Sequence, residues 1–192
     1  MSQTLRSVLC LGLALLLAGC GGAREKSYRL SASEAASTGG SASGLSVVVG
    51  PVSLPSYIDR AELVFASGSN EFQVPSDALW LGSLKENISR TVAADLGGIL
   101  RSRNVRSSLD GGARSSSRVA LTVKQFHGIS GQEAILDLSW RIQSGASGQT
   151  ISRHNGSFRE PIVGDGYEPL VQAQSRLLEQ ASRAIAGSLR GR

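Results

Sequence analysis

The chain has 192 residues, a formal net charge of +5 and basic residues that are almost all arginine. This length suits one domain with a packed hydrophobic core plus a short tether. The basic residues lack the aromatic interleaving that binding of single-stranded nucleic acid needs, so we expect no nucleic acid partner.

The N-terminus has the features of a secretion signal that ends at a lipid attachment site. A basic Arg6 precedes an apolar run at residues 8–17, which is too short to span a bilayer but has the length of a signal-peptide core. The motif Leu-Ala-Gly-Cys at residues 17–20 follows and resembles the lipobox of bacterial lipoproteins, in which the cysteine thiol is acylated. The alternative is an ordinary secretion signal with a chance cysteine, but the Gly/Ser-rich sequence after Cys20 favours lipidation.

By this resemblance, residues 1–19 are a signal peptide and Cys20 becomes the acylated N-terminus of the mature chain. It would carry several acyl chains, palmitate among them, and more than one chain gives stable anchoring because each buried methylene contributes about 0.8 kcal/mol. Gly21 stands where retention in the inner membrane favours aspartate, so we expect an outer-membrane location facing the periplasm. Cys10 leaves with the signal, and the thiol of Cys20 would carry lipid. The mature chain would then have no free thiol for a disulfide, a nucleophile or a thiolate metal site.

Residues 20–44 combine the modified cysteine with a stretch rich in Ser, Ala and Gly, and we expect a flexible tether there. About 20 such residues reach on the order of 25 Å, enough to hold a domain just off a membrane surface. Tyr28-Arg29-Leu30 interrupts this composition with an apolar pair, so it is a candidate for a short edge strand.

The folded domain is expected to occupy residues 45–192. Alternating β-branched residues predict a strand at its start, and the runs 62–65 and 71–74 flank a Ser-Gly-Ser-Asn loop that predicts a hairpin. Apolar residues at spacings of three and four then predict a long helix over about residues 78–102, with Asp95 on a polar face.

The second half of the domain repeats the order of strands followed by a helix. Four strands are predicted, at residues 105–109, 119–126, 134–143 and 150–158. In the third, Leu138 and Trp140 share an apolar side opposite a polar one, which is typical of an antiparallel strand with one wet face. The fourth either continues through Asn155-Gly156 or breaks there, because Asn-Gly is a strong hairpin signal.

A second helical pattern at residues 167–190 closes the chain. The order of elements predicts an α+β fold, a mostly antiparallel sheet with two long helices packed on one face and the other face partly free. Arginines in the middle of the chain form a candidate lipid-facing or partner-facing patch, although a solvated helix end and loop is the plainer interpretation. These residues are Arg101, Arg103, Arg106, Arg114 and Arg118.

One motif links the chain to a family. The segment Val-Gly-Pro-Val-Ser-Leu-Pro-Ser-Tyr-Ile-Asp-Arg at residues 49–60, followed by Leu79-Trp80, resembles the auxiliary lipoproteins of ABC-type lipid transporters, the PqiC-like family named for the paraquat-inducible operon. With the lipobox and the closing helix, the likeness spans most of the chain. The resemblance implies an accessory subunit that docks from the outer membrane onto a mammalian-cell-entry (MCE) domain protein, which carries lipid between the two membranes of a Gram-negative envelope.

Few residues support catalysis, and we expect no enzyme, no cofactor and no metal site. His127 and His154 are the only histidines and lack metal-ligand spacing. The stretch at residues 40–44 has alanine at the nucleophile position of Gly-x-Ser-x-Gly. Asp59 would need a second carboxylate for acid/base chemistry, which the sequence does not place beside it.

Two functions remain open. In the first, the chain is a tethered docking or accessory module of an MCE/ABC-type lipid transport system. In the second, it is an activator or assembly factor of another envelope machine, such as a cell-wall synthase, a secretin or a lipopolysaccharide exporter. Self-association into a homo-oligomer is open under both.

Under the first hypothesis, residues of the proline-bounded loop contact the partner. The candidate partner-binding residues are Pro55, Tyr57, Asp59, Arg60 and Trp80. Tyr57 is the best anchor because aromatic side chains supply large contact area, with a core position beneath the loop as its alternative. Trp80, in the first turn of the expected helix, either caps the core or stands at its rim.

Overall fold

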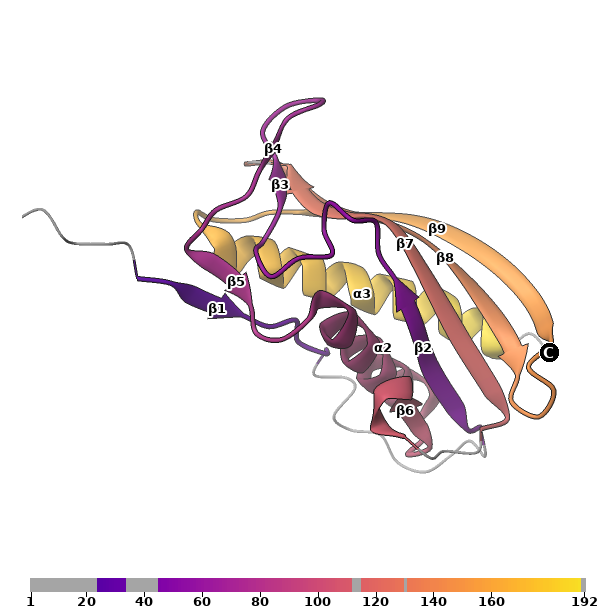
Figure 1. Ribbon diagram of the computed structural model, residues 1–192. Helices are drawn as coiled ribbons and strands as arrows, with labels where there is room; N and C mark the ends of the chain where they lie inside the picture. The colour runs from indigo at the N-terminus through magenta and orange to yellow at the C-terminus, as the bar shows by residue number, and fades with distance from the viewer. Residues whose placement is uncertain (1–23, 34–44, 112–114, 130, 191–192) are drawn as a thin grey trace, which may run out of the picture.

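The computed structural model describes residues 24–33, 45–111, 115–129 and 131–190, and it shows a sheet with two helices on one face (Figure 1). The seven strands of the sheet are β2 (Val47–Ser53), β3 (Phe65–Ala66), β4 (Phe72–Gln73), β6 (Val105–Ser107), β7 (Ser117–Ile129), β8 (Glu133–Ser144) and β9 (Thr150–Pro161). The helices are α2 (Leu84–Leu100) and α3 (Tyr167–Arg190). A separate ladder joins β1 (Lys26–Tyr28) to β5 (Ala78–Trp80), and one 3-10 turn, η3 (Ser108–Asp110), follows β6.

The α+β class and the two helices are as predicted. The signal peptide, Cys20, the tether residues 34–44 and Arg114 lie outside the described residues, so the predictions for them stay predictions. In the described part of the chain, neither helix combines the length and the apolar content that crossing a membrane would require.

Strand β7 lies at the centre of the sheet. It pairs in parallel with β2 and, near its end, with β3, while its other side pairs antiparallel with β8, which continues antiparallel to β9. β6 adds to β2 in parallel, and β4 returns antiparallel beside β3. The prediction of a mostly antiparallel sheet is therefore wrong, because the sheet is mixed. The chain between β2 and β6 ends with helix α2 and returns to the end of the sheet where β2 begins. Strands β2 and β6 therefore run parallel.

Helix α2 begins at Leu84 and not at residue 78. Ser83 caps it, since its Oγ accepts the Glu86 N–H at 3.2 Å, and the helix ends where Arg101 adopts a left-handed φ of 50°. The residues expected in its first turn form strand β5 instead, because β1 is available to pair with them. Trp80 is consequently a strand residue, which corrects its predicted place in the helix.

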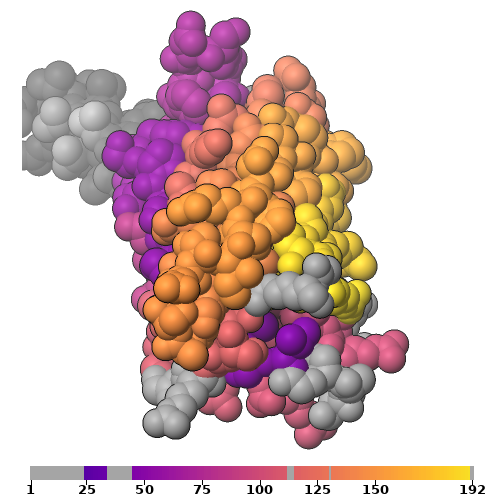
Figure 2. All heavy atoms as spheres, turned by 90° about the vertical axis from the view of Figure 1, so that its right-hand side faces the viewer, coloured from indigo at the N-terminus to yellow at the C-terminus, as the bar shows by residue number. Residues whose placement is uncertain are grey.

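Helices α2 and α3 cover the same face of the sheet, as predicted, and the apolar side chains of that face form the core with them. Leu138 and Trp140 belong to this core, at 2% and 4% exposed, whereas the intervening Ser139 is only half-buried. β9 runs unbroken through Asn155 and Gly156, so the alternative of a break there is wrong. Since both helices of the described residues pack on the core face, no helix among these residues covers the outer face of the sheet. Figure 2 shows β9, in orange, bordered by α3, in yellow.

Residues 26–33, within the predicted tether, are part of the fold, and we call them the N-terminal strap. The strap begins as β1, where the Lys26 N–H donates to the Asp77 carbonyl at 2.8 Å. Leu30 is 3% exposed and belongs to the core. The candidate strand near Tyr28 is confirmed, and the tether prediction is wrong for this stretch, because its apolar side chains find a place on the helices.

Trp140→Ala tests the assignment of the core face. We expect the free energy of unfolding to fall by roughly 3–5 kcal/mol, since the variant removes a large buried side chain. The tryptophan is 4% exposed and stacks on His154 with ring centroids 5.5 Å apart. Chemical denaturation gives the measurement, and Ile151→Ala, at an exposed residue of the neighbouring strand, is the control and should change stability by about 0.5 kcal/mol or less. Equal stability of both variants would show that the face is wrongly assigned.

Candidate functional site

The motif at residues 49–60 begins within β2 and continues into the loop that follows this strand. Gly50 has a φ of +125°, and a Cβ at this position would lie 2.1 Å from Oγ of Ser108, so only glycine fits. The carbonyl of Pro55 accepts the N–H groups of Ile58 and Asp59, both at 3.2 Å, which closes the loop into a turn. Ile58 is 1% exposed and fixes the loop to the core.

Tyr57 is half-buried in this loop and lies against Phe72 and His127. The ring of Tyr57 is 5.2 Å from that of Phe72 and 6.0 Å from that of His127, and the latter two are 5.1 Å apart. Tyr57 Oη and His127 Nδ1 are hydrogen-bonded at 3.2 Å, while Phe72 is 44% exposed. We call these three residues the aromatic cluster. It lies on the outer face of the sheet, because His127 follows the core residue Phe126 along β7.

Burial keeps the aromatic cluster uncharged. It raises the pKa of Tyr57 and lowers the pKa of His127, although the Asp137 carboxylate opposes the change at the histidine. Asp137 is itself paired with Arg159 at 2.8 Å, so no free charge borders the imidazole on this side. A neutral, partly exposed set of rings on a surface is suited to contact with a protein.

The other predicted site residues divide into exposed and buried ones. Asp59 accepts from Lys85 Nζ at 2.6 Å, and Arg60 donates to Glu62 at 2.9 Å; both pairs are solvent-exposed, so they add little stability and can exchange partners. Trp80 is 6% exposed, and its backbone N–H donates to the Ala61 carbonyl at 2.7 Å. The structure therefore gathers the loop residues beyond the end of β2 and places Trp80 in the core, where it can support the loop but offers little surface to a partner.

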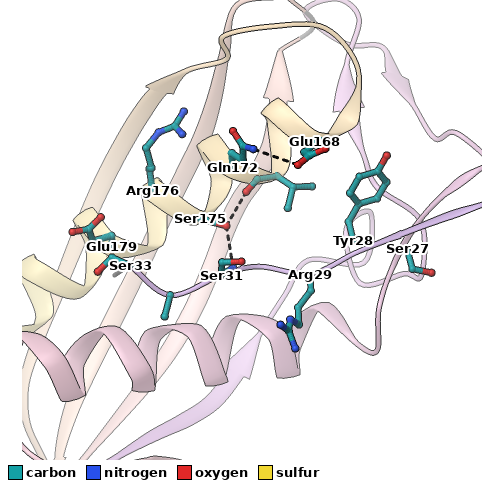
Figure 3. A pocket seen from close by; sticks show the side chains of 12 residues that line it. Ser27, Tyr28, Arg29, Ser31, Ser33, Glu168, Gln172, Ser175, Arg176 and Glu179 are labelled. Carbon is teal, nitrogen blue, oxygen red and sulfur yellow. Dashed lines mark hydrogen bonds between the residues drawn. The ribbon is translucent and has the colours of Figure 1, made fainter. Parts of the chain in front are cut away.

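A second candidate region is the groove of about 960 Å³ between the N-terminal strap and α3 (Figure 3). Its first residues pair with β5 as β1, and beyond β1 the strap is held by side chains of the two helices. The Ser31 N–H donates to Oγ of Ser175 on α3 at 3.1 Å, and the Leu30 N–H donates to Oδ1 of Asn87 on α2 at 3.3 Å. The α3 wall carries the charged or polar side chains Glu168, Gln172, Arg176 and Glu179. These side chains suit a polar ligand better than an acyl chain.

Asp95 anchors the end of the strap. It is fully buried on α2, and its Oδ1 accepts the Ser33 N–H at 2.8 Å. Burial raises its pKa to about 6 against the opposing effect of that N–H, and the nearby carboxylate of Glu179 adds to the rise. The helical pattern predicts Asp95 on a polar, solvent-facing side, and the strap is what covers that side.

The two histidines occupy structural positions. His127 belongs to the aromatic cluster, and His154 stacks on Trp140 while its Nε2 shares a hydrogen bond of 3.0 Å with Oγ of Ser152. Among the described residues, no three His, Cys, Asp or Glu side chains are grouped to hold a metal ion. Sequence reasoning missed Phe72, His127 and Asp95, since each gains its role from segments far away in the chain.

The buried carboxyl of Asp95 predicts a pH-dependent stability. Its folded pKa of about 6 lies above the ordinary value of 3.8, so its contribution is fully present below about pH 4 and is lost as the pH rises through 6. We expect the Tm of the parent to fall relative to that of Asp95→Asn between about pH 4.5 and 7.5, because asparagine does not titrate. Thermal unfolding at both pH values measures this. Glu179→Gln controls for the neighbouring charge, and a parent-to-variant Tm difference independent of pH would contradict the assignment.

Comparison with known proteins identifies the family. A family model described as the ABC-type transport auxiliary lipoprotein component matches residues 28–186. The chain is similar in fold to a crystal structure of an uncharacterised protein, with 20% identity and a TM-score of 0.70 over 86% of this chain and 99% of that one. It is also similar to a DUF330 protein from Xanthomonas campestris, with 16% identity and a TM-score of 0.66 over 85% and 94% of the two chains.

A sequence search of curated proteins finds no significant match. The two structures share too little sequence to show more than the fold, whereas the family model covers most of the chain, from the strap into α3. This match confirms the resemblance carried by the motif at residues 49–60, and the chain belongs to the ABC-type transport auxiliary lipoprotein family.

Proposed function

We propose that this chain is the accessory, docking subunit of an ABC-type intermembrane lipid transport system, anchored through Cys20 in the outer membrane and bound to an MCE-domain protein. The observation that carries the proposal is the position of the motif loop. It sets Tyr57 against the exposed Phe72 on the sheet face that the two helices leave free. Family membership supplies the transport context, and aromatic residues are enriched where protein partners bind.

The N-terminal strap supports a close and oriented attachment. With Cys20 acylated, only residues 21–25 would join the lipid to β1, and they span at most about 18 Å. The strap contacts α2 and α3 on their side away from the sheet. Residues 24–29 carry the exposed cations Arg24, Lys26 and Arg29 and one exposed acid, Glu25, a net positive charge that suits anionic headgroups. The strap side would then face the membrane and the aromatic cluster would face the periplasm.

Photocrosslinking in intact envelopes of the native host tests the docking role. A photoreactive amino acid in place of Phe72 should crosslink to the MCE-domain protein, since this side chain is 44% exposed beside Tyr57. Leu109 on η3 is 49% exposed and distant from the aromatic cluster in the fold, so the same substitution there is the control and should give no such product. Recovery of a cell-wall synthase, a secretin or a lipopolysaccharide exporter from Phe72 would favour the alternative hypothesis and overturn the MCE proposal.

Cys20→Ser tests the anchor. We expect the domain to fold normally but to lose acylation and processing at the lipobox, because the thiol is the acceptor. Mass spectrometry and membrane fractionation measure both effects against the parent chain. An unmodified Cys20 at the mature N-terminus of the parent would rule out lipidation, and an acylated protein found in the inner membrane would rule out the outer-membrane location.

A further inference from the structure

Four arginines lie on the outer face of the sheet, because along their strands they alternate with residues that face the core. They are Arg106 on β6, Arg118 on β7, Arg141 on β8 and Arg153 on β9, and all are exposed. Val48 of β2 pairs with both Arg106 and Arg118, and Arg141 pairs directly with Arg153, so the registers place the four close together. We call these residues the arginine face.

The arginine face has no carboxylate of its own. Several arginines elsewhere are paired with acids, at 2.7 Å for Arg90 with Asp110, 2.8 Å for Arg159 with Asp137 and 2.6 Å for Arg176 with Glu160. Within the described part of the chain, none of the four makes an ion pair. Their other cross-strand neighbours are uncharged: Val48 beside Arg106 and Arg118, Gln143 opposite Arg118, and Ala120 opposite Arg141.

The sheet gains no stability from this arrangement by itself. Arg141 and Arg153 stand directly opposite each other, and like charges in that relation destabilise a pair of strands. Neutral β-branched residues at these solvent-exposed positions would stabilise the sheet more than arginines do. An external anion would offset the repulsion, so the arginine face is chemically suited to an anionic ligand.

We propose that the arginine face binds a carboxylate-rich surface of a protein partner. Guanidinium groups donate to carboxylates through two parallel hydrogen bonds, and arginine is enriched at protein interfaces. Thr122, Ser139 and Asn155 pair across β7, β8 and β9 in the next row and add neutral donors and acceptors. Ile151, at 52% exposed and two residues from Arg153, adds an apolar contact.

The position of the strap favours a protein over the anchoring membrane, a step that rests on the proposed lipidation of Cys20. The strap and the arginine face lie on opposite sides of the helix layer, because α2 and α3 contact the sheet on one side and the strap on the other. A tether of residues 21–25 would bring the strap side to the membrane and turn the arginine face away from it. A face-to-face contact between the arginine faces of two copies does not fit, since the two faces would repel each other.

Crosslinking from Asn155 tests the arginine face in the full-length lipoprotein in its native host. A photoreactive amino acid at this exposed position should capture a protein, and the mapped partner peptide should contain Asp or Glu. The triple variant Arg118→Gln, Arg141→Gln and Arg153→Gln should lower the yield about tenfold, because each exposed charge pair changes binding by a small factor. Its Tm should equal or exceed that of the parent, since the Arg141–Arg153 repulsion is gone, which separates lost binding from misfolding.

A matched control removes the same charge from exposed arginines on the two helices and should leave the yield unchanged: Arg90→Gln, Arg183→Gln and Arg190→Gln. In a charge exchange, Arg141→Glu should abolish capture, and an Asp or Glu to Lys change in the mapped partner peptide should restore it. Failure of this rescue, an unchanged yield in the triple variant, or no captured protein would overturn the proposal.

A membrane arm distinguishes the other occupant. If the purified chain binds vesicles of phosphatidylethanolamine and phosphatidylglycerol, and the triple variant does not, the arginine face belongs to a lipid surface and the proposal fails. The Phe72 crosslinks test the MCE role separately. If no crosslink forms between Phe72 and an MCE-domain protein while capture from Asn155 is intact, the proposed function is overturned. The arginine face would then remain a site for an acidic protein partner.

Discussion

Pairing of β7 with β2, β3 and β8 is the interaction on which the arrangement of the other elements depends. Its register with β8 shifts between Val123 and Gln125, so the alternation changes phase there: Phe126 turns into the core and His127 turns outward. The same strand therefore presents the arginine face near its beginning and the aromatic cluster near its end. Both candidate binding surfaces are held by one rigid ladder, which fixes their relative position.

The helices are covered on two sides, and this gives the molecule two unlike surfaces. The sheet buries one side of α2 and α3, and the N-terminal strap crosses the other, where it hides Asp95. In the proposed orientation the strap side belongs to the lipid anchor and the sheet side belongs to partners. Because the strap is clamped by side chains of both helices, movement of the anchor would be transmitted to the domain and not absorbed by a long tether.

The motif that links this chain to its family has a structural explanation. Gly50 must be glycine to leave room for Ser108 and to adopt its positive φ, and Ile58 fastens the loop to the core. Pro55 begins the turn whose N–H groups its carbonyl accepts. These residues fix where the loop lies, while Tyr57 and its neighbours Asp59 and Arg60 form the part that a partner can reach.

The sequence by itself determined the features that depend on local periodicity. The stripes of α3 and the alternation around Trp140 predicted a helix, a strand and a core face correctly, because an amphipathic pattern reflects the geometry of its own element. Only the tertiary structure decided which strands are neighbours, since alternation looks the same beside a parallel or an antiparallel partner. Trp80 became a strand residue because distant β1 pairs with it, and Asp95 became buried because the strap crosses it. Pairing and burial depend on which remote surfaces meet, and no short stretch of sequence contains that information.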